Sequence, residues 1–114
     1  MILTIDQKQI APDITVLEMV GRIIMGNNSR DVELKLAQVL NDRKKKIILD
    51  LAGITMLDST GVGILVLSQA KVKKEGGELR IAGAQGVVDE ILKMTSVDKL
   101  VKVFPNVEAA AANF

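Results

Sequence analysis

The sequence predicts an α/β protein with one mixed β-sheet, an antiparallel strand pair at its N-terminal side, and crossover helices packed on it. Residues 46–51, KIILDL, form a continuous apolar run, which is typical of a central strand buried on both faces. From residue 46 onward, strand-like and helix-like segments alternate, which favours parallel pairing through crossover helices. Because 114 residues is an ordinary domain size, we expect residues 1–114 to form a single domain.

The opening strand pair is predicted from two apolar stretches separated by a turn. Residues 2–9 alternate loosely, as in a half-exposed strand, and residues 11–13, APD, favour a turn. Residues 14–20 resume the strand pattern, and Gly21 indicates a bulge or bend before residues 22–24. An antiparallel pair is the simplest arrangement of these segments.

The first helix is expected to run to about residues 41–42, with Asn28 or Ser29 as its capping residue. Its apolar residues recur at helical spacing and share one face: Val32, Leu36, Val39 and Leu40. Leu34 lies off that face, so we expect it to be exposed.

The second half of the chain starts with the buried strand at 46–51 and a short loop, which lead to a second helix. This helix is predicted from Asp58 or Ser59 to about Lys74, and Gly76-Gly77 ends it because glycine accepts the left-handed cap conformation. Further elements then follow in alternation: strands at 78–83 and 101–104, and helical segments at 85–94 and 107–114. Within the helix at 85–94, one side carries Val88, Ile91 and Leu92.

Composition excludes several classes of function. With 48% hydrophobic residues, two Phe, and no Trp or Tyr, the core is aliphatic and the stacking platforms used for single-stranded nucleic acid are missing. Fifteen Lys plus Arg against fourteen Asp plus Glu give a net charge of +1, which argues against direct nucleic-acid binding or an anionic membrane surface. The basic run 43–46 is interpreted as a solvated edge between a helix and a strand, with a phosphate or nucleotide contact as the alternative.

The chain has no Cys and no His, so zinc fingers, iron–sulfur ligation, thiol catalysis and a Ser-His-Asp triad are excluded within it. We expect no metal and no cofactor. No apolar run approaches the roughly 20 residues of a membrane span, and no signal-peptide pattern is visible. We therefore expect a soluble, cytoplasmic protein without membrane insertion.

The segment with the most functional information is ITMLDSTGVGIL, residues 54–65. Asp58, Ser59 and Thr60 lie at a predicted helix start, where such side chains ordinarily serve as caps. Gly61 and Gly63 follow inside the helix, where each glycine costs roughly 1 kcal/mol relative to Ala. Glycine there suggests that something approaches the backbone closely, so the hydroxyls are either caps or groups displayed for chemistry.

The helical wheel of this segment separates two faces. The face predicted to cover the sheet carries Val62, Leu65, Val66 and Ala70. Ile64 falls on the opposite face with Gly61, Ser68 and Lys71. We therefore expect Ile64 to be exposed, either incidentally or as an apolar spot beside Ser59 that a partner protein covers.

Self-contained catalysis is not expected. Ser59 would need a base within hydrogen-bond reach, the chain has no histidine, and Asp58 is a weak base at its ordinary pKa. The segment also lacks the G-x-S-x-G elbow of hydrolases and the G-x-x-x-x-G-K-[ST] phosphate loop. The sequence favours a binding protein over an enzyme.

Residues 47–66, IILDLAGITMLDSTGVGILV, resemble the bacterial anti-sigma factor antagonists, which are STAS-domain proteins. That family has an apolar strand, a short loop, and Asp-Ser-Ser/Thr-Gly-Leu-Gly at a helix start. The matching residues here are Asp58, Ser59, Thr60, Gly61 and Gly63, with Val62 in the usual leucine place. Segments 73–83 and 91–110 are also similar to their counterparts, so the resemblance implies a STAS-like fold over nearly the whole chain.

The resemblance implies a switchable binding protein. In the family, the serine that matches Ser59 is phosphorylated by the partner, an anti-sigma factor that is an ATP-dependent serine kinase. The unphosphorylated form binds this partner and frees a sigma factor, which regulates transcription, and a metal-dependent serine phosphatase reverses the modification. The partner-binding residues expected here are Asp58, Thr60, Gly61, Val62, Gly63 and Ile64. For the oligomeric state, a monomer and a weak dimer both stay open.

One departure from the family pattern concerns residues 21–24. The family commonly has Gly-x-Leu/Ile-Asp before the first helix, whereas this chain has Gly21-Arg22-Ile23-Ile24, with Ile24 in the acidic position of the partner-facing edge. This favours an alternative function, a STAS subunit of a signalling scaffold or transporter that is not phosphorylated. A third candidate is a small-molecule or nucleotide-binding domain that uses the helix N-terminus as an anion site.

Overall fold

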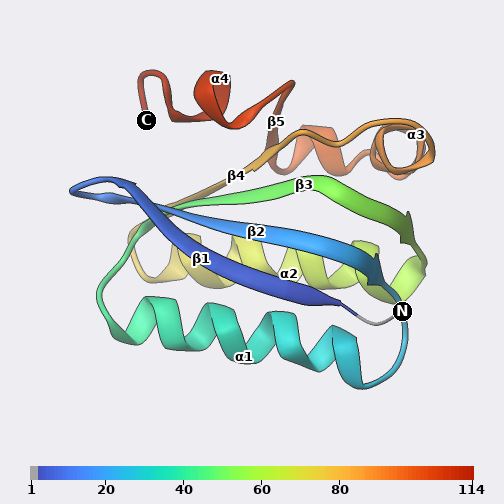
Figure 1. The fold of residues 1–114 in the computed structure, drawn as a ribbon, viewed down its shortest axis with the longest axis horizontal. Helices are drawn as coiled ribbons and strands as arrows, with labels where there is room; N and C mark the ends of the chain where they lie inside the picture. Colours follow the sequence, from blue (N-terminus) through green and yellow to red (C-terminus); the bar gives the residue numbers. More distant parts are fainter. Residues whose placement is uncertain (1–2) are drawn as a thin grey trace.

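The computed structural model describes residues 3–114, apart from the side chains of residues 27–29. It contains a five-stranded sheet in the order β1-β2-β3-β4-β5 (Figure 1). The strands are β1 (Thr4–Ala11), β2 (Ile14–Ile23), β3 (Lys46–Leu57), β4 (Glu78–Ala82) and β5 (Lys102–Phe104). β1 pairs antiparallel with β2, and the other neighbours are parallel. The predicted mixed α/β fold is confirmed.

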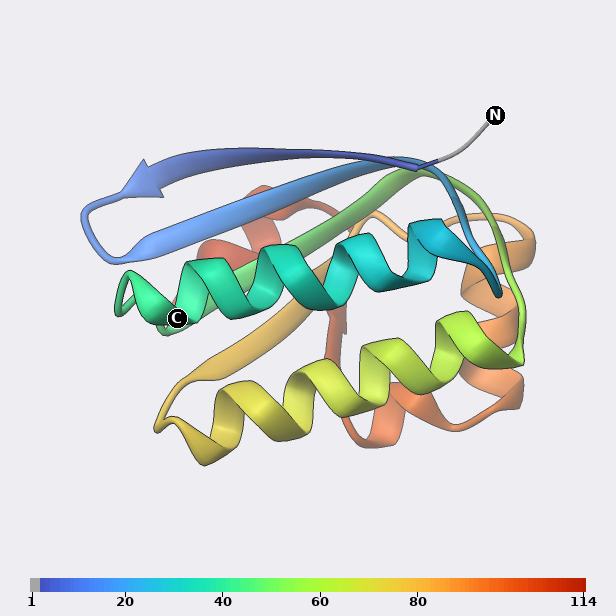
Figure 2. The same cartoon turned by 90° about the horizontal axis from the view of Figure 1, so that it is seen from below.

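The helices lie on both faces of this sheet. α1 (Asn27–Asn41) and α2 (Ser59–Lys74) run side by side and in the same direction across one face (Figures 1 and 2). α4 (Val107–Ala111) packs on the opposite face, and α3 (Val87–Met94) packs against β3 with the larger core. A single 3₁₀ turn, Val97–Lys99, leads into β5. Within residues 3–114, no helix combines the length and the apolar character that crossing a membrane requires.

The alternation of side chains along the central strand explains the two cores. On β3, Ile47, Leu49 and Leu51 are fully buried in the cluster beneath α1 and α2, whereas Ile48 is buried in a smaller cluster with Ala110 of α4. A strand covered on both faces needs apolar residues at consecutive positions. The continuous run at 46–51 is therefore the central strand that the sequence predicted.

The opening hairpin is confirmed, and β2 has irregularities where a bulge was expected. The strand predicted at 2–9 is observed as Thr4–Ala11, and residue 2 lies outside the described residues. The register of β2 against β3 shifts between Glu18 and Val20 and again between Gly21 and Arg22. These shifts let β2 continue to Ile23, where it pairs with Leu57.

β3 is longer than predicted, and this is a correction. The segment expected to be a short loop, residues 52–56, is part of the strand Lys46–Leu57. Its pairing with the extended β2 continues through Leu57, so the sheet carries the chain directly to Asp58. The loop prediction failed because Ala52 and Gly53 have low strand propensity and only the neighbouring strand sustains the pairing.

α1 and α2 end where the sequence predicted, whereas α3 begins at Val87 instead of residue 85 and α4 ends at Ala111 instead of residue 114. α1 ends at Asn41 as expected, and Leu34 is 61% exposed. α1 begins at Asn27 with Gly26 as its N-cap, so the predicted capping residue, Asn28 or Ser29, is wrong; the side chains of residues 27–29 lie outside the described residues. α2 ends at Lys74 as predicted, and Gly76, which follows its C-cap, has a left-handed φ of 83°. The Gly77 amide donates to the Val72 carbonyl at 2.9 Å and the Gly76 amide to that of Lys73 at 3.0 Å, which is the Schellman arrangement.

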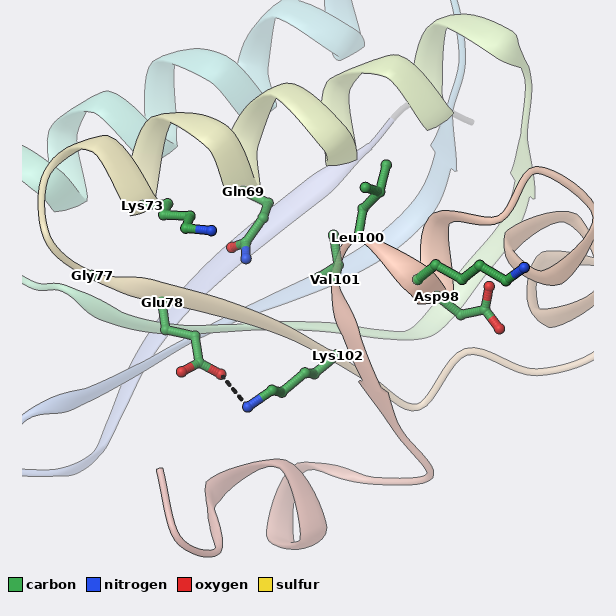
Figure 3. A pocket seen from close by; sticks show the side chains of 9 residues that line it. Gln69, Lys73, Gly77, Glu78, Asp98, Leu100, Val101 and Lys102 are labelled. Atoms are coloured by element: carbon green, nitrogen blue, oxygen red, sulfur yellow. Dashed lines mark ion pairs between the residues drawn. The ribbon is translucent and has the colours of Figure 1, made fainter.

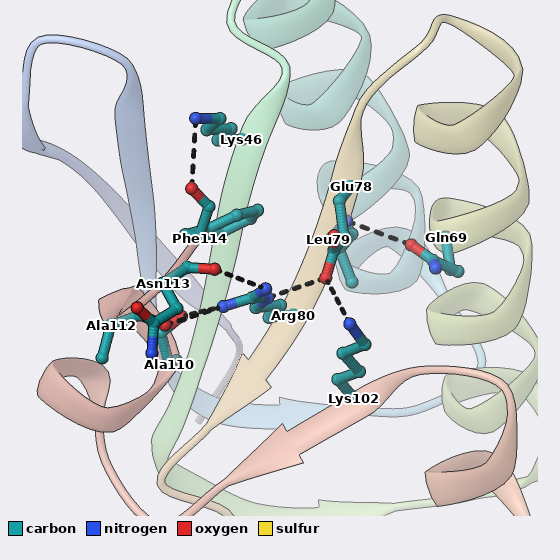
Figure 4. A network of polar contacts seen from close by, with 10 residues as sticks. All are labelled: Lys46, Gln69, Glu78, Leu79, Arg80, Lys102, Ala110, Ala112, Asn113 and Phe114. Atoms are coloured by element: carbon teal, nitrogen blue, oxygen red, sulfur yellow. Dashed lines mark hydrogen bonds and ion pairs between the residues drawn. The ribbon is translucent and has the colours of Figure 1, made fainter.

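A buried arginine on β4 holds the C-terminal segment (Figure 4). Arg80 is 6% exposed, and its Nη1 donates to the carbonyls of Ala110 at 2.8 Å and Ala112 at 3.3 Å. Its Nε donates to Glu78 at 2.7 Å. Burial of a guanidinium is costly unless its donors are satisfied, so these contacts account for a charged residue beneath α4.

The basic run 43–46 lies in the turn between α1 and β3, as the sequence indicated. Arg43 and Lys45 are exposed, and Lys46 donates to Asp13 at 2.8 Å. Its charges therefore lie at a solvated edge.

Candidate functional site

The candidate site is centred on Asp58, at the point where β3 passes into α2. Asp58 is the N-cap of α2, and its Oδ1 accepts a hydrogen bond from the Gly61 amide at 2.8 Å. Its other carboxylate oxygen, Oδ2, accepts from the Met25 amide at 2.9 Å. Because β2 and β3 are parallel, their carboxyl ends meet at one edge of the sheet. Asp58 therefore fastens the loop after β2 to the first turn of α2.

These contacts set the charge state of Asp58. The Met25 amide, and after it the Gly61 amide, hold the pKa of the Asp58 carboxyl below its ordinary value of 3.8. Hydrogen bonds donated to a carboxylate favour its ionised form. Asp58 is thus an anion at neutral pH and a poorer base than a free aspartate, which argues further against activation of Ser59 as a nucleophile.

Ser59 occupies the first position of α2 and is exposed. Within the described residues, its hydroxyl makes no hydrogen bond to another side chain. The first amides of a helix and its macrodipole favour negative charge at this position. Ser59 is therefore available to a modifying enzyme at a place that tolerates an added anion.

At Gly61, the group that approaches the helix backbone closely is another part of the same chain. A Cβ atom at this position would lie 2.1 Å from the Ile23 carbonyl oxygen, far inside van der Waals contact. Only glycine lets the first turn of α2 pack this closely against the end of β2. Gly61 is structural.

Gly63 differs, because a Cβ atom there would meet nothing within 4 Å. The described structure gives no steric reason for a glycine in the second turn of α2. The residue leaves an open backbone surface beside Ser59, and Thr60 and Val62 lie half-buried around it.

Ile64 is a correction to the sequence-based interpretation. The residue is only 5% exposed and belongs to the main core, so it is not an apolar spot for a partner to cover. The buried residues of α2 are Gly61, Ile64, Leu65, Ser68 and Val72. Ala70, predicted on the sheet face, is exposed. The buried arc is rotated because α2 packs against α1 as well as against the sheet.

Two exposed apolar residues that sequence reasoning missed lie near this site. Met25, whose amide binds Asp58, is 75% exposed, and Leu67, two turns along α2 from Ser59, is 64% exposed. Ile24, singled out from the sequence, is half-buried instead. Spacing gave a signal for Leu67, since Ser59, Gly63 and Leu67 recur every four residues.

A separate hollow of about 320 Å³ lies toward the other end of α2 (Figure 3). Gln69 and Lys73 of α2, the start of β4 and residues 98–102 line it. Its charges are mixed, and Lys102 lies 3.7 Å from Glu78. The hollow does not include the Asp58-Ser59 segment.

The fold and the site together define a small α/β module that presents an exposed serine at a helix start, without a catalytic base beside it. The family model of the STAS domain matches residues 7–110, so the chain belongs to the STAS domain family.

The known proteins that resemble this chain are named as anti-sigma factor antagonists or as transporter family proteins. A Thermotoga maritima protein provisionally named as an anti-sigma factor antagonist is 26% identical over 64% of this chain and 65% of its own length, so the match spans less than two thirds of that relative. An anti-sigma factor antagonist from Mycobacterium paratuberculosis has a similar fold, with a TM-score of 0.83, 22% identity, and coverage of 95% of this chain and 90% of that chain.

Two further solved structures share the fold. SpoIIAA of Bacillus, solved in its phosphorylated form, has a TM-score of 0.70 at 12% identity, with coverage of 93% of this chain and 96% of that chain. A sulfate transporter family protein from Wolinella succinogenes has a TM-score of 0.73 at 21% identity, with coverage of 92% of this chain and 87% of that chain.

Proposed function

We propose that this protein is an anti-sigma factor antagonist of the bacterial cytoplasm, controlled by phosphorylation of Ser59. In its unphosphorylated form it binds a serine-kinase anti-sigma factor and so releases a sigma factor; phosphorylation ends this binding, and a serine phosphatase restores it. The observation that carries the proposal is the exposed Ser59 at the first position of α2, in a chain of the STAS family. The names of the relatives support the same role.

The geometry supplies a physical basis for the switch. A phosphoserine adds about −1.5 to −2 charges at pH 7. At Ser59 this charge stands next to the Asp58 carboxylate, which already accepts the Met25 and Gly61 amides. A partner surface packed over this face meets two adjacent anions after phosphorylation. Repulsion and desolvation then oppose binding, while α2 itself tolerates the charge.

The test is intact-mass spectrometry of the protein incubated with ATP and each serine-kinase anti-sigma factor from its own genome, with Ser59→Ala alongside. We expect one added phosphate on the wild type and none on the variant. We also expect a stable complex with the same kinase that Ser59→Asp disrupts. Phosphorylation of Ser59→Ala would move the acceptor to Thr60. An absence of phosphate with every kinase would overturn the proposal.

A second candidate function is a STAS subunit of a transporter or signalling scaffold without a phosphate switch. The fold similarity to the Wolinella succinogenes sulfate transporter family protein favours it, as does Ile24 in place of the family's acidic residue. This candidate requires a stoichiometric complex that neither Ser59→Ala nor Ser59→Asp changes.

A further inference from the structure

A groove runs between α1 and α2 on the helical face of the molecule. The two helices lie side by side, and both begin at the end of the molecule where Ser59 lies (Figure 2). The hollow between them has a volume of about 160 Å³ and is lined by Glu33, Leu36, Ile64, Leu67, Ser68 and Lys71.

The floor of the groove is buried and consists of two aliphatic residues and one serine, whereas one side of its rim is exposed. Leu36, Ile64 and Ser68 are each at most 5% exposed. Leu67, which stands at the rim, is 64% exposed. An exposed leucine next to an apolar hollow leaves hydrocarbon in water that a partner could cover.

The size of the hollow limits what can enter it. A cavity of about 150 Å³ lined by aliphatic side chains is large enough to hold a benzene molecule. The groove at about 160 Å³ therefore accommodates one large apolar side chain, such as leucine, methionine or phenylalanine. This is the size of an anchor residue presented by a docked helix.

The charged residues at the two rims indicate which charges a partner carries on either side of its apolar anchor. Glu33 stands on the α1 side and Lys71 on the α2 side, and neither makes an ion pair within the described residues. A complementary surface therefore places a basic residue toward α1 and an acidic residue toward α2, on either side of its apolar anchor.

The groove is continuous with the Ser59 face. Residues four apart lie on one side of a helix, so Ser59, Gly63 and Leu67 follow one another along α2. Gly63 adds no side chain between them, and its outer side is open. A partner that covers Ser59 thus meets no side chain at Gly63 as it extends along α2 toward Leu67.

We propose that this groove receives an amphipathic helix of the anti-sigma factor, with one large apolar side chain inserted beside Leu67 and charged residues of opposite sign facing Glu33 and Lys71. The inference rests on the proposed function, because it assigns the occupant to the same partner. This second contact with the partner lies in the groove between α1 and α2, outside the Ser59 segment.

The test compares Leu67→Asp with Leu34→Asp in binding to the genome's serine-kinase anti-sigma factors by calorimetry. Leu34 is a matched control because it is 61% exposed on α1 but does not line the groove. We expect Leu67→Asp to weaken binding at least tenfold, as loss of an interface anchor does, and Leu34→Asp to change it less than about threefold. Lys71→Glu should also weaken binding, and Glu33→Lys likewise.

The outcomes separate this inference from the proposed function. Tight binding that Ser59→Asp abolishes but Leu67→Asp leaves unchanged would overturn the groove contact and keep the proposed function. Absence of wild-type binding to every kinase would overturn both. If sedimentation shows a wild-type dimer that Leu67→Asp dissociates, the groove's occupant is a second copy of the chain and the inference is wrong. Unchanged thermal melting of Leu67→Asp excludes misfolding as the cause.

Discussion

Gly61 and Gly63 lie two positions apart in one helix, yet the structure gives them opposite surroundings. Gly61 is in contact with the Ile23 carbonyl, whereas Gly63 faces open space. The same substitution therefore has opposite physical consequences at the two positions. From the sequence alone, both are simply residues of low helix propensity.

We expect Gly61→Ala to destabilise the protein by ~3 kcal/mol, because the added methyl group must displace α2 from β2. We expect Gly63→Ala to stabilise it by about 0.5–1 kcal/mol through reduced backbone entropy in the unfolded chain. Urea unfolding of the two variants beside the wild type measures both changes. Equal effects of one sign would contradict the geometry described for α2.

Asp58 makes stability depend on pH in a direction that its hydrogen bonds determine. Its pKa is lowered in the folded state, chiefly by the Met25 amide, relative to the ordinary value of 3.8. A carboxyl with a depressed folded pKa contributes stability above its unfolded pKa and loses it as the pH falls through the folded pKa.

The variant Asp58→Asn isolates this effect, since all other carboxyls are shared with the wild type. We expect the urea midpoint of the wild type to exceed that of the variant at pH 7. The difference should shrink as the pH falls below 3.8. A difference that stays constant from pH 7 to pH 2.5 would show that the charge of Asp58 has no part in the cap.

At the scale of elements, the C-terminal segment depends on Arg80. We expect Arg80→Met to cost about 2–4 kcal/mol, because the carbonyls of α4 and the residues after it lose their buried donor. Hydrogen exchange should show residues 107–114 losing protection before β3 does. Arg80→Lys should recover little of the loss, since one ammonium cannot reproduce the planar fork of donors.

Lys102→Met is the control for Arg80→Met. Lys102 also approaches Glu78, at 3.7 Å, but its side chain is 67% exposed. Exposed ion pairs contribute little, so we expect a change below about 0.5 kcal/mol. Equal losses for the two variants would mean that Glu78, and not the C-terminal carbonyls, determines the effect of Arg80.

Some features of the helices and strands could be predicted from the sequence, and others could not. Hydrophobic periodicity and turn-forming residues were enough to predict the antiparallel opening pair, the alternation of strands and helices after residue 46, the irregularity at Gly21 and the end of α2 at Lys74. The predicted face of α2 was wrong because Gly61 is buried against the Ile23 carbonyl at the end of β2 and Ser68 is buried between α1 and α2, which a count of apolar residues cannot detect. The extension of β3 to Leu57 depends on pairing with β2, a contact distant in the sequence. For the candidate site, the motif located Ser59 and Asp58, while the bond to the Met25 amide needed the folded chain.

For the molecule as a whole, the placement of Ser59 predicts a switch that leaves the fold unchanged. Ser59→Asp adds a negative charge where the first amides of a helix favour it, although the Asp58 carboxylate next to it opposes the added charge. We expect its melting temperature to lie within about 3 °C of the wild type. Circular dichroism measures this, with Leu65→Asp, a fully buried position, as a control that unfolds. A large loss of stability in Ser59→Asp would mean that a negative charge at this position acts by unfolding the domain and not by changing its surface.

The position of the aromatic residues has a consequence for spectroscopy. The chain has two Phe and neither Trp nor Tyr, and both phenyl rings lie against Arg80, with Cζ at 5.3 Å from the Phe104 centroid and 4.1 Å from that of Phe114. Near-ultraviolet signals of this protein therefore report on the C-terminal segment alone and are silent about the Ser59 face. A tryptophan introduced beside the groove would fluoresce against a dark background, so partner docking and the attachment of α4 can be followed in one sample at separate wavelengths.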